Sequence, residues 1–374
     1  MKKRILSIFL SALLILTLLA PAAIAEDRPW PTREFVTGER IPLRKALALE
    51  AFCVRDAIAD GNVFTDSVLV LHKGEIVYER HARGWDAETR HQMYSVTKSV
   101  LSALVGVAIA DGKIQSVEQK VIEFFDDLTI PAGQEAKNGI TIEHLLRQTS
   151  GLPGDGDRES EAVEWWAAED SGKACFLFPQ MAAPGERFAY SSAAGMQTLS
   201  ALLAIAVGGD LFDYAKSKLF GPLGMTSVTW DAADDGVYYG GFGFSMSPRD
   251  MARLGYLYLN HGKWDGVQII PAEYVAATPP PAGMNYGYLF WGFSDKEGYE
   301  NAYGANGAFG QRIWILPGQD AVIVRTGSAG PLTTAVRNGA QRNDLVLWLF
   351  MNVVYPFVPL KGVPLHYFME TLGT

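Results

Sequence analysis

The stretch Tyr94-Ser95-Val96-Thr97-Lys98-Ser99 places a serine three positions before a lysine at the start of an apolar segment. Apolar residues continue to about residue 110 with almost no polar face, which predicts a helix over 96–110 that is buried on most sides. Residues three apart lie on one face of a helix. We therefore expect the amine of Lys98 to lie beside the hydroxyl of Ser95.

This pair has the chemistry of an activated nucleophile. A serine hydroxyl is a poor nucleophile at neutral pH, and a neighbouring amine can take its proton only when the amine is neutral, a form that burial favours. The unpaired amides of the first helical turn can stabilise an oxyanion. Because an SxxK pattern arises often by chance, the prediction also depends on the rest of the chain.

The first 25 residues predict a secretory signal peptide, 1–25, cleaved after Ala25. Lys2, Lys3 and Arg4 precede a mostly apolar run, 5–19, that is shorter than the roughly 18 to 20 residues of a membrane span. We therefore expect a secreted or periplasmic protein with no stable membrane anchor after cleavage.

The composition excludes some partners and leaves other questions open. The net charge of −9 becomes more negative once the basic leader is removed, so the surface should repel nucleic acid.

Cys53 and Cys175 could form one disulfide or remain two buried thiols. The six histidines show no metal-ligand spacing, and neither a metal nor an organic cofactor is expected. The oligomeric state is left open.

Strand patterns occur near both ends of the chain, with helical patterns between them. We expect one antiparallel sheet built from both chain ends, flanked by helices and carrying a large inserted helical subdomain, in an α+β fold. The expected boundaries are 26–94 with 295–374 for the sheet subdomain and 95–294 for the helical one. The expected hairpins are 67–71 with 76–80 and 311–316 with 321–326; the expected helices include 43–59, 141–147, one from Ser191 or Ser192 to Val207, one that begins at Ser247 and ends at Gly262, and 339–353.

Several segments together resemble the serine hydrolases related to class C β-lactamases. These include D-alanyl-D-alanine carboxypeptidases, family VIII carboxylesterases and 6-aminohexanoate-dimer hydrolases. The resemblance covers about 66–327 and implies a β-lactamase/transpeptidase-like fold. It rests on the SxxK segment, on TIEHLLRQTSGLP (141–153), PGERFAYSS (184–192), FGPLGM (220–225), residues 247–262 and GANGAFG (304–310).

The resemblance implies roles for individual residues. Ser95 would be the nucleophile, Lys98 its proton acceptor, and Tyr190 the tyrosine of the family's YxN box. The family's KTG box would fall on residues 302–304, Ala302-Tyr303-Gly304. The amide of Ala305 would then complete the oxyanion hole beside that of Ser95.

Two departures from the family pattern bear on the substrate. Ser192 replaces the YxN asparagine and Ala302 replaces the KTG lysine, so two groups that would hold a β-lactam are absent from their expected places. Arg312 or Arg325 could supply a cation instead. The expected substrate pocket includes Ser192, Tyr303, Gly304, Asn306 and Trp165; further candidates for an aromatic wall are Trp166, Tyr238, Tyr239 and Trp291.

The resulting prediction is an exported serine hydrolase that cleaves a small ester or amide through an acyl-enzyme on Ser95. A β-lactamase or D,D-carboxypeptidase is the alternative enzyme. A β-lactam-binding or sensor protein that is acylated without turnover is the alternative outside enzymes.

Overall fold

The computed structural model describes residues 29–157, 164–292 and 301–329, apart from 45, 48, 51–52 and 54–62. The predicted leader and the predicted helix at 339–353 lie outside the described residues. At the centre is a six-stranded antiparallel sheet. Its strands, in spatial order, are β2 (Glu75–His81), β1 (Val63–His72), β11 (Ala321–Ala329), β10 (Arg312–Leu316), β9 (Tyr303–Asn306) and β8 (Trp291–Gly292).

The sheet joins segments from both ends of the chain, as the sequence predicts. Strand β1 pairs with β11, so that His72 lies opposite Ala321. The β1–β2 hairpin turns at Lys73 and Gly74, which have φ angles of 53° and 85°. A two-residue turn with positive φ at both residues has a backbone twist that matches the right-handed twist of the flanking strands. Both predicted hairpins are present, with β1 and β11 longer than expected.

Both faces of the sheet are covered. On one face, the buried side chains of Leu49 and Cys53 pack in a cluster with Trp314 and other sheet residues. The other face lies against α9 (Pro248–Leu259), where a Cβ atom at Gly255 would lie only 2.6 Å from Val322. The missing side chain thus lets this helix approach the sheet closely.

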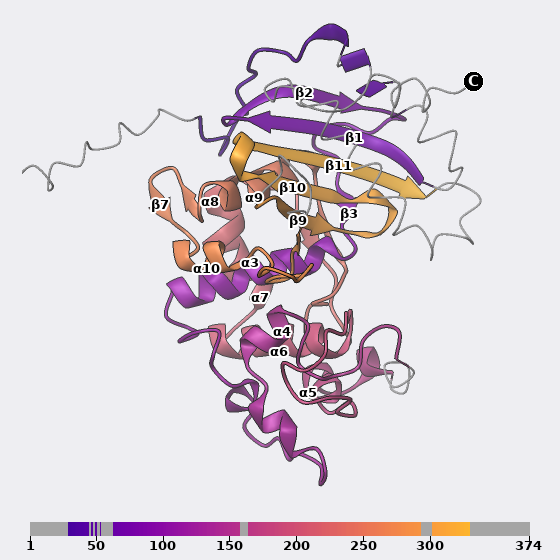
Figure 1. Ribbon diagram of the computed structural model, residues 1–374, viewed down its shortest axis with the longest axis vertical. Coiled ribbons are helices and arrows are strands. Elements are labelled where there is room, and N and C mark those ends of the chain that lie inside the picture. The colour runs from indigo at the N-terminus through magenta and orange to yellow at the C-terminus, as the bar shows by residue number, and fades with distance from the viewer. Residues whose placement is uncertain are drawn as a thin grey trace, which may run out of the picture.

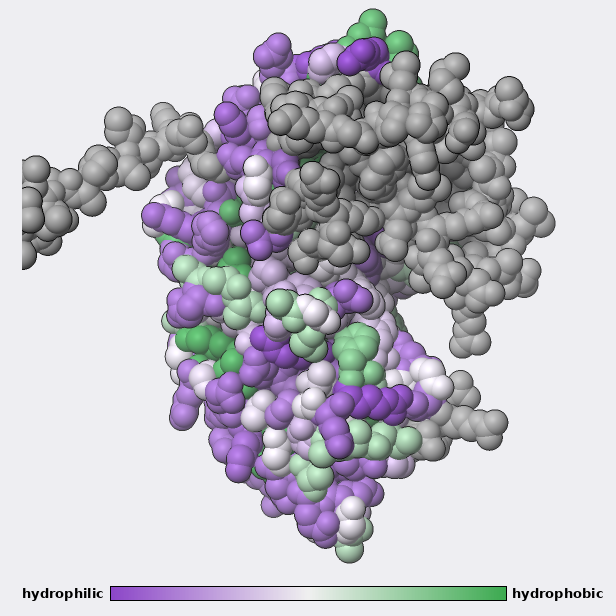
Figure 2. Space-filling view, in the orientation of Figure 1, coloured by the Kyte–Doolittle hydropathy of each residue, from purple (hydrophilic) through white to green (hydrophobic). Residues whose placement is uncertain are grey.

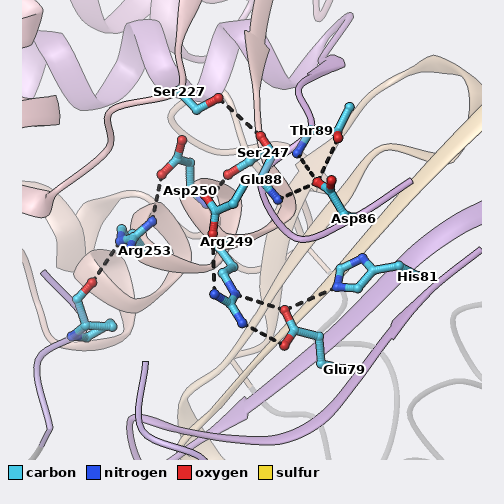
Figure 3. Close-up of polar contacts among 11 residues, drawn as sticks. Glu79, His81, Asp86, Glu88, Thr89, Ser227, Ser247, Arg249, Asp250 and Arg253 are labelled. Carbon is cyan, nitrogen blue, oxygen red and sulfur yellow. Dashed lines mark hydrogen bonds and ion pairs between the residues drawn. The ribbon is translucent and has the colours of Figure 1, made fainter. Parts of the chain in front are cut away.

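Charged side chains fix α9 to the sheet and to two loops (Figure 3). Arg249 donates to both carboxylate oxygens of Glu79 on β2, each at 3.0 Å, and to Glu88 at 3.3 Å. Arg253 donates to Asp250 and to the carbonyl of Pro31, each at 2.8 Å. The helix that covers the sheet therefore also holds the N-terminal segment around Pro31.

The remaining helices lie on the side of the sheet that α9 covers (Figure 1). They are α3 (Val96–Ala110), α4 (Ile142–Leu146), α5 (Ser171–Phe176), α6 (Ala194–Val207), α7 (Leu211–Ala215), α8 (Gly221–Leu223) and α10 (Ala272–Ala277). Short strands are β3 (His91–Gln92), β4 (Thr229–Trp230), β5 (Phe244–Met246), β6 (Lys263–Trp264) and β7 (Val267–Gln268). The α+β class and the antiparallel sheet flanked by helices are confirmed.

Both cysteines are buried, and neither forms a disulfide. Cys53 belongs to the cluster on the outer face of the sheet, whereas Cys175 lies in the core of the helical part. The question of a disulfide, which the sequence left open, is thereby answered in favour of two thiols.

The described part of the face seen in Figure 2 is mainly hydrophilic, with small separate hydrophobic areas. Within the described residues, no single helix is both long and apolar enough to cross a membrane. Helix α6 and the segment 211–223 meet those two criteria only as a pair bent by 75°.

Candidate active site

Helix α3 spans the residues that the apolar pattern predicts, and its first turn is firmly held. The Thr97 hydroxyl accepts a hydrogen bond from the amide of Phe244 at 3.2 Å, and the Ser99 hydroxyl donates to the carbonyl of Leu289 at 2.7 Å. Just before the helix, Tyr94 has a φ of 48°, a left-handed conformation that costs a non-glycine residue about 1 kcal/mol or more. Such strain persists only where the surrounding structure enforces it.

Lys98 is fully buried and lies at the centre of the site. Its Nζ is 3.1 Å from Ser95 Oγ, 2.9 Å from Ser192 Oγ and 3.0 Å from the carbonyl oxygen of Gly241. The structure therefore brings together the serine and the lysine that the sequence singles out. Ser95 is half-buried, which leaves its hydroxyl open to a substrate.

Tyr190 lies against the same lysine. The Nζ of Lys98 lies over the tyrosine ring, 4.6 Å from its centroid. The ring stacks on Trp291, with centroids 5.6 Å apart, and meets the edge of Tyr286 at 5.8 Å. The contact with Lys98 is thus made by the face of an aromatic ring that two neighbours hold in place.

The loop that follows α4 holds the segment that carries Tyr190. Gln148 accepts from the amide of Ser191 at 2.9 Å and donates to its carbonyl at 3.1 Å. The amide of Asp155 donates to the Tyr190 carbonyl at 2.8 Å. A Cβ atom at Gly154 would lie 2.8 Å from that carbonyl oxygen, so glycine is needed for the approach. The segment 148–155 therefore supports the site through the side chain of Gln148 and through the backbone of Gly154 and Asp155.

Neither Ser191 nor Ser192 caps α6, so the prediction that one of them does so is wrong. The helix begins at Ala194, and no side chain caps it. The Ser192 hydroxyl instead contacts Lys98 and donates to Asp155 Oδ2 at 2.7 Å, while the Ser192 amide donates to Asp155 Oδ1 at 2.6 Å. The Ser192 side chain therefore links Asp155 to Lys98 and does not cap the helix.

Gly241 is a site residue that the sequence analysis did not predict. A Cβ atom there would lie 2.0 Å from the carbonyl oxygen of Ser192. The absence of a side chain lets the turn reach the start of α6 and direct a carbonyl at Lys98. Asp155 was also missed, because the sequence gave no sign that it faces Ser192.

The predicted oxyanion amide of Ala305 is not supported by the structure. Ala305 is fully buried in β9, where it lies opposite Ile313 of β10. A substrate oxygen could not reach that amide. The predicted KTG position, Ala302-Tyr303-Gly304, is likewise misplaced. The turn at residues 93–95, which carries the predicted nucleophile Ser95 and is called the nucleophile turn below, is contacted by residues further along the chain than 304.

The meeting point lies at residues 307–309. A Cβ atom at Gly307 would be 2.3 Å from the carbonyl oxygen of Met93, and the ring of Phe309 lies 5.0 Å from that of Tyr94. Ala308 is exposed and sits between these two contacts, which flank Ser95 on its N-terminal side. The glycine that packs against the nucleophile turn is therefore Gly307.

Several residues of the predicted pocket are buried. Tyr303 and Trp165 are 3% and 5% exposed, respectively, and belong to the core, so they do not form an aromatic wall. Gly304 is buried in β9, and Asn306 is half-buried at its end. The aromatic residues gathered around Tyr190 are Trp291, Tyr286 and the exposed Phe188, of which the sequence suggested only the first.

The two candidate cations hold the turn that follows β9. Arg312 donates to the carbonyl of Gln311 at 2.8 Å and also bonds that of Gly307. Arg325 donates to the carbonyl of Gly310 at 3.0 Å and to the Thr65 hydroxyl at 3.0 Å. Both arginines therefore stabilise the backbone beside Ala308. Over the described ranges, no group of three or more acidic, histidine or cysteine side chains is placed to bind a metal ion.

The chain is similar to known proteins in sequence and in fold. The beta-lactamase family model matches residues 52–347. A 6-aminohexanoate-dimer hydrolase from Paenarthrobacter ureafaciens is 25% identical over 314 residues, which cover 75% of this chain and 77% of the relative.

Two solved structures share the fold. EstCE1, a hydrolase with promiscuous acyltransferase activity, has a TM-score of 0.66 at 16% identity and covers 83% of this chain and 98% of its own. An octameric penicillin-binding protein homologue from Pyrococcus abyssi has a TM-score of 0.61 at 21% identity. The match covers 80% of this chain and 77% of the homologue. Since the family model matches most of the sequence, the chain belongs to the beta-lactamase family and is a serine hydrolase.

Proposed function

We propose that this protein cleaves a small ester or amide through an acyl-enzyme on Ser95. The observation that carries the proposal is the position of the buried Lys98 amine, 3.1 Å from the Ser95 hydroxyl at the start of α3. A serine with an adjacent base is the arrangement that nucleophilic catalysis requires.

In the acylation step, neutral Lys98 takes the proton from Ser95 Oγ as this oxygen attacks the substrate carbonyl carbon. The amides of Ser95 and Ala308 would stabilise the negative oxygen that results. Lys98, now charged, returns a proton to the leaving alcohol or amine, assisted by Tyr190 at its side. In the second step the same groups deprotonate a water molecule, which attacks the acyl carbon and releases the acid and free Ser95.

Three features favour an ester or a linear amide over a β-lactam. Strand β9 contains no lysine, and Ala302, just before the strand, and Ala305, within it, are both buried. The hydroxyl of Ser192 is already bonded to Asp155. The curated relative is named for the hydrolysis of an aminohexanoate dimer, and EstCE1 is described as a hydrolase with acyltransferase activity.

The test is turnover of three substrates by the wild type and Ser95→Ala: p-nitrophenyl butyrate, a linear aminohexanoate oligomer and nitrocefin. Ser95→Ala should lose at least about 10³-fold in kcat on the substrate that the wild type turns over. Ser116→Ala, on an exposed turn, is the matched control and should keep wild-type activity.

Other results would point elsewhere. Near-normal ester hydrolysis by Ser95→Ala would refute the nucleophile. Turnover of nitrocefin alone would indicate a β-lactamase, and stoichiometric labelling without product release would indicate a protein that is acylated but does not turn over.

We also propose that the protein is exported. The basic and apolar composition of residues 1–25 supports this, with cleavage after Ala25. The intact mass of the protein recovered outside the cytoplasm should lack these residues; a mass that includes them would contradict the proposal.

A further inference from the structure

We propose that Asp155, acting through Ser192, orients the lone pair of Lys98 toward Ser95. The inference deepens the proposed function and rests on it. It makes Asp155 a positioning residue, since its carboxylate bonds Ser192 rather than the reacting atoms.

The argument begins with the hydrogen-bonding capacity of Lys98. A neutral amine has two N–H donors and one lone pair, and three oxygen atoms surround its nitrogen. The Gly241 carbonyl can only accept a hydrogen bond, so it takes one N–H. The other N–H and the lone pair remain to be divided between the hydroxyls of Ser95 and Ser192.

The hydroxyl of Ser192 decides that division. A hydroxyl has a single proton. If Ser192 donates its proton to Lys98, it occupies the lone pair that must receive the proton of Ser95. If Ser192 donates elsewhere, it accepts the second N–H, and the lone pair faces Ser95.

Asp155 enforces the second arrangement. The backbone N–H of Ser192 points at Oδ1, at 2.6 Å, and its hydroxyl lies 2.7 Å from Oδ2. An ionised carboxylate accepts on both oxygens and donates on neither. The Ser192 proton is therefore directed at Asp155, and the hydroxyl oxygen is left to accept from Lys98.

An asparagine in place of Asp155 would reverse this polarity. The backbone N–H of Ser192 is a fixed donor, so the amide oxygen must face it. The NH₂ group would then face the Ser192 hydroxyl and donate to it, and that hydroxyl would turn its proton toward the lone pair of Lys98. An alanine would only release the hydroxyl, which could still donate to water.

The experiment compares Asp155→Asn with Asp155→Ala by the rate of Ser95 labelling with a fluorophosphonate probe and by kcat/KM on a p-nitrophenyl ester. Rates are taken at pH values where they no longer rise with pH. Asp155→Asn should be slower than the wild type by about tenfold or more, and slower than Asp155→Ala, although asparagine is the closer match in shape.

The same pair of substitutions in a Ser192→Ala background removes the hydroxyl that mediates the effect. There the asparagine and alanine variants should differ by less than about twofold. An alanine variant that is slower than the asparagine variant in the Ser192 protein would show that Asp155 merely supports the loop, and would overturn the inference.

Asp157→Asn is the matched control in the same loop. Asp157 accepts from the side chain of Arg187 and from the amide of Gly154. A loss equal to that of Asp155→Asn would attribute the effect to loop folding and refute the inference. Loss of activity in Ser95→Ala, with no change in either Asp155 variant, would refute only the inference and leave the proposed function standing.

Discussion

The side-chain nitrogen of Lys98 lies 3.0 Å from the carbonyl oxygen of Gly241, a residue 143 positions further along the chain. A backbone carbonyl gives a buried amine an acceptor without introducing a second charge into the site. Because a carbonyl cannot donate, it also fixes the direction of one hydrogen bond of Lys98. The position of Lys98 thus depends on a turn that contributes a backbone carbonyl to the site.

Gly241→Ala should impair catalysis strongly. The added Cβ would lie 2.0 Å from the Ser192 carbonyl oxygen and 2.7 Å from its carbonyl carbon, distances that force the backbone to move. The acceptor of Lys98 and the position of Ser192 would shift together. We expect kcat/KM on a p-nitrophenyl ester to fall by about tenfold or more, since small displacements in an active site are costly.

The control is Gly209→Ala, at a glycine with open space around its Cβ position. It should keep wild-type kinetics. Wild-type activity in Gly241→Ala would show that the turn tolerates a side chain, contrary to the contact described above.

A second buried lysine stabilises the helical part. Lys137 is fully buried and donates to the carbonyls of Phe176, the last residue of α5, and Phe178, at 2.8 Å and 2.6 Å. Lys137→Met would leave both carbonyls without this donor. We expect a loss of about 2 kcal/mol in the free energy of unfolding, measured by urea denaturation at pH 7.

The loss should grow in alkaline solution. Burial lowers the pKa of Lys137 from 10.5 to about 8, so between these values the unfolded chain binds the proton that the folded chain has released. Wild-type stability should therefore rise with pH in this window relative to Lys137→Met. A difference between the two proteins that stays constant from pH 8 to 10 would contradict the shift.

His91 should make the protein sensitive to acid. It is buried beneath Trp85, and its Nε2 lies 3.2 Å from the Thr326 hydroxyl. Burial, followed by the charges of His81 and Arg83, lowers its pKa from 6.5 to about 4. The Asp66 carboxylate, 3.8 Å from its Nδ1, is already paired with Arg83.

The sign follows from proton binding. Between pH 4 and 6.5 the unfolded chain holds a proton on this histidine that the folded chain lacks, so stability falls as the pH is lowered through that range, by up to about 3 kcal/mol. The slope of the free energy of unfolding against pH reflects the difference in bound protons between the unfolded and folded chains. In His91→Gln this difference should be smaller by about one proton over that pH range. Equal slopes in the two proteins would show that His91 titrates normally.

The sequence predicted the parts of the fold that local patterns control. The uninterrupted apolar run of α3 and the glycine turn after β1 were sufficient for those elements. Thr141 and Ser247 both cap helices by accepting backbone hydrogen bonds, as their positions suggested.

The errors occurred where tertiary contacts override local patterns. Ser192 looks like a helix cap, but Asp155 and Lys98 engage its hydroxyl. The oxyanion amide was placed on Ala305 because residues 302–304 were matched to the glycine-rich box. Only the packing of Gly307 against Met93 shows where the strand meets the nucleophile turn.

Phe188 should influence the choice of substrate. It is 43% exposed, and its ring lies 5.5 Å from Tyr286 and 6.5 Å from Trp291, which both contact Tyr190. An exposed aromatic ring at this position offers apolar contact to a long acyl chain. Phe188→Ala should remove about 1 kcal/mol of that contact and raise KM for p-nitrophenyl octanoate about fivefold, with kcat unchanged.

The acetyl ester supplies the internal comparison, because its acyl chain is too short to reach the ring and its KM should stay near the wild-type value. Ile205→Ala controls for a general loss of surface hydrophobicity, because Ile205 is a similarly exposed apolar side chain near the C-terminal end of α6. If both esters lost affinity equally in Phe188→Ala, the ring would be holding Tyr190 in place through Tyr286 and Trp291. Selective loss for the longer ester would identify direct contact with the acyl chain.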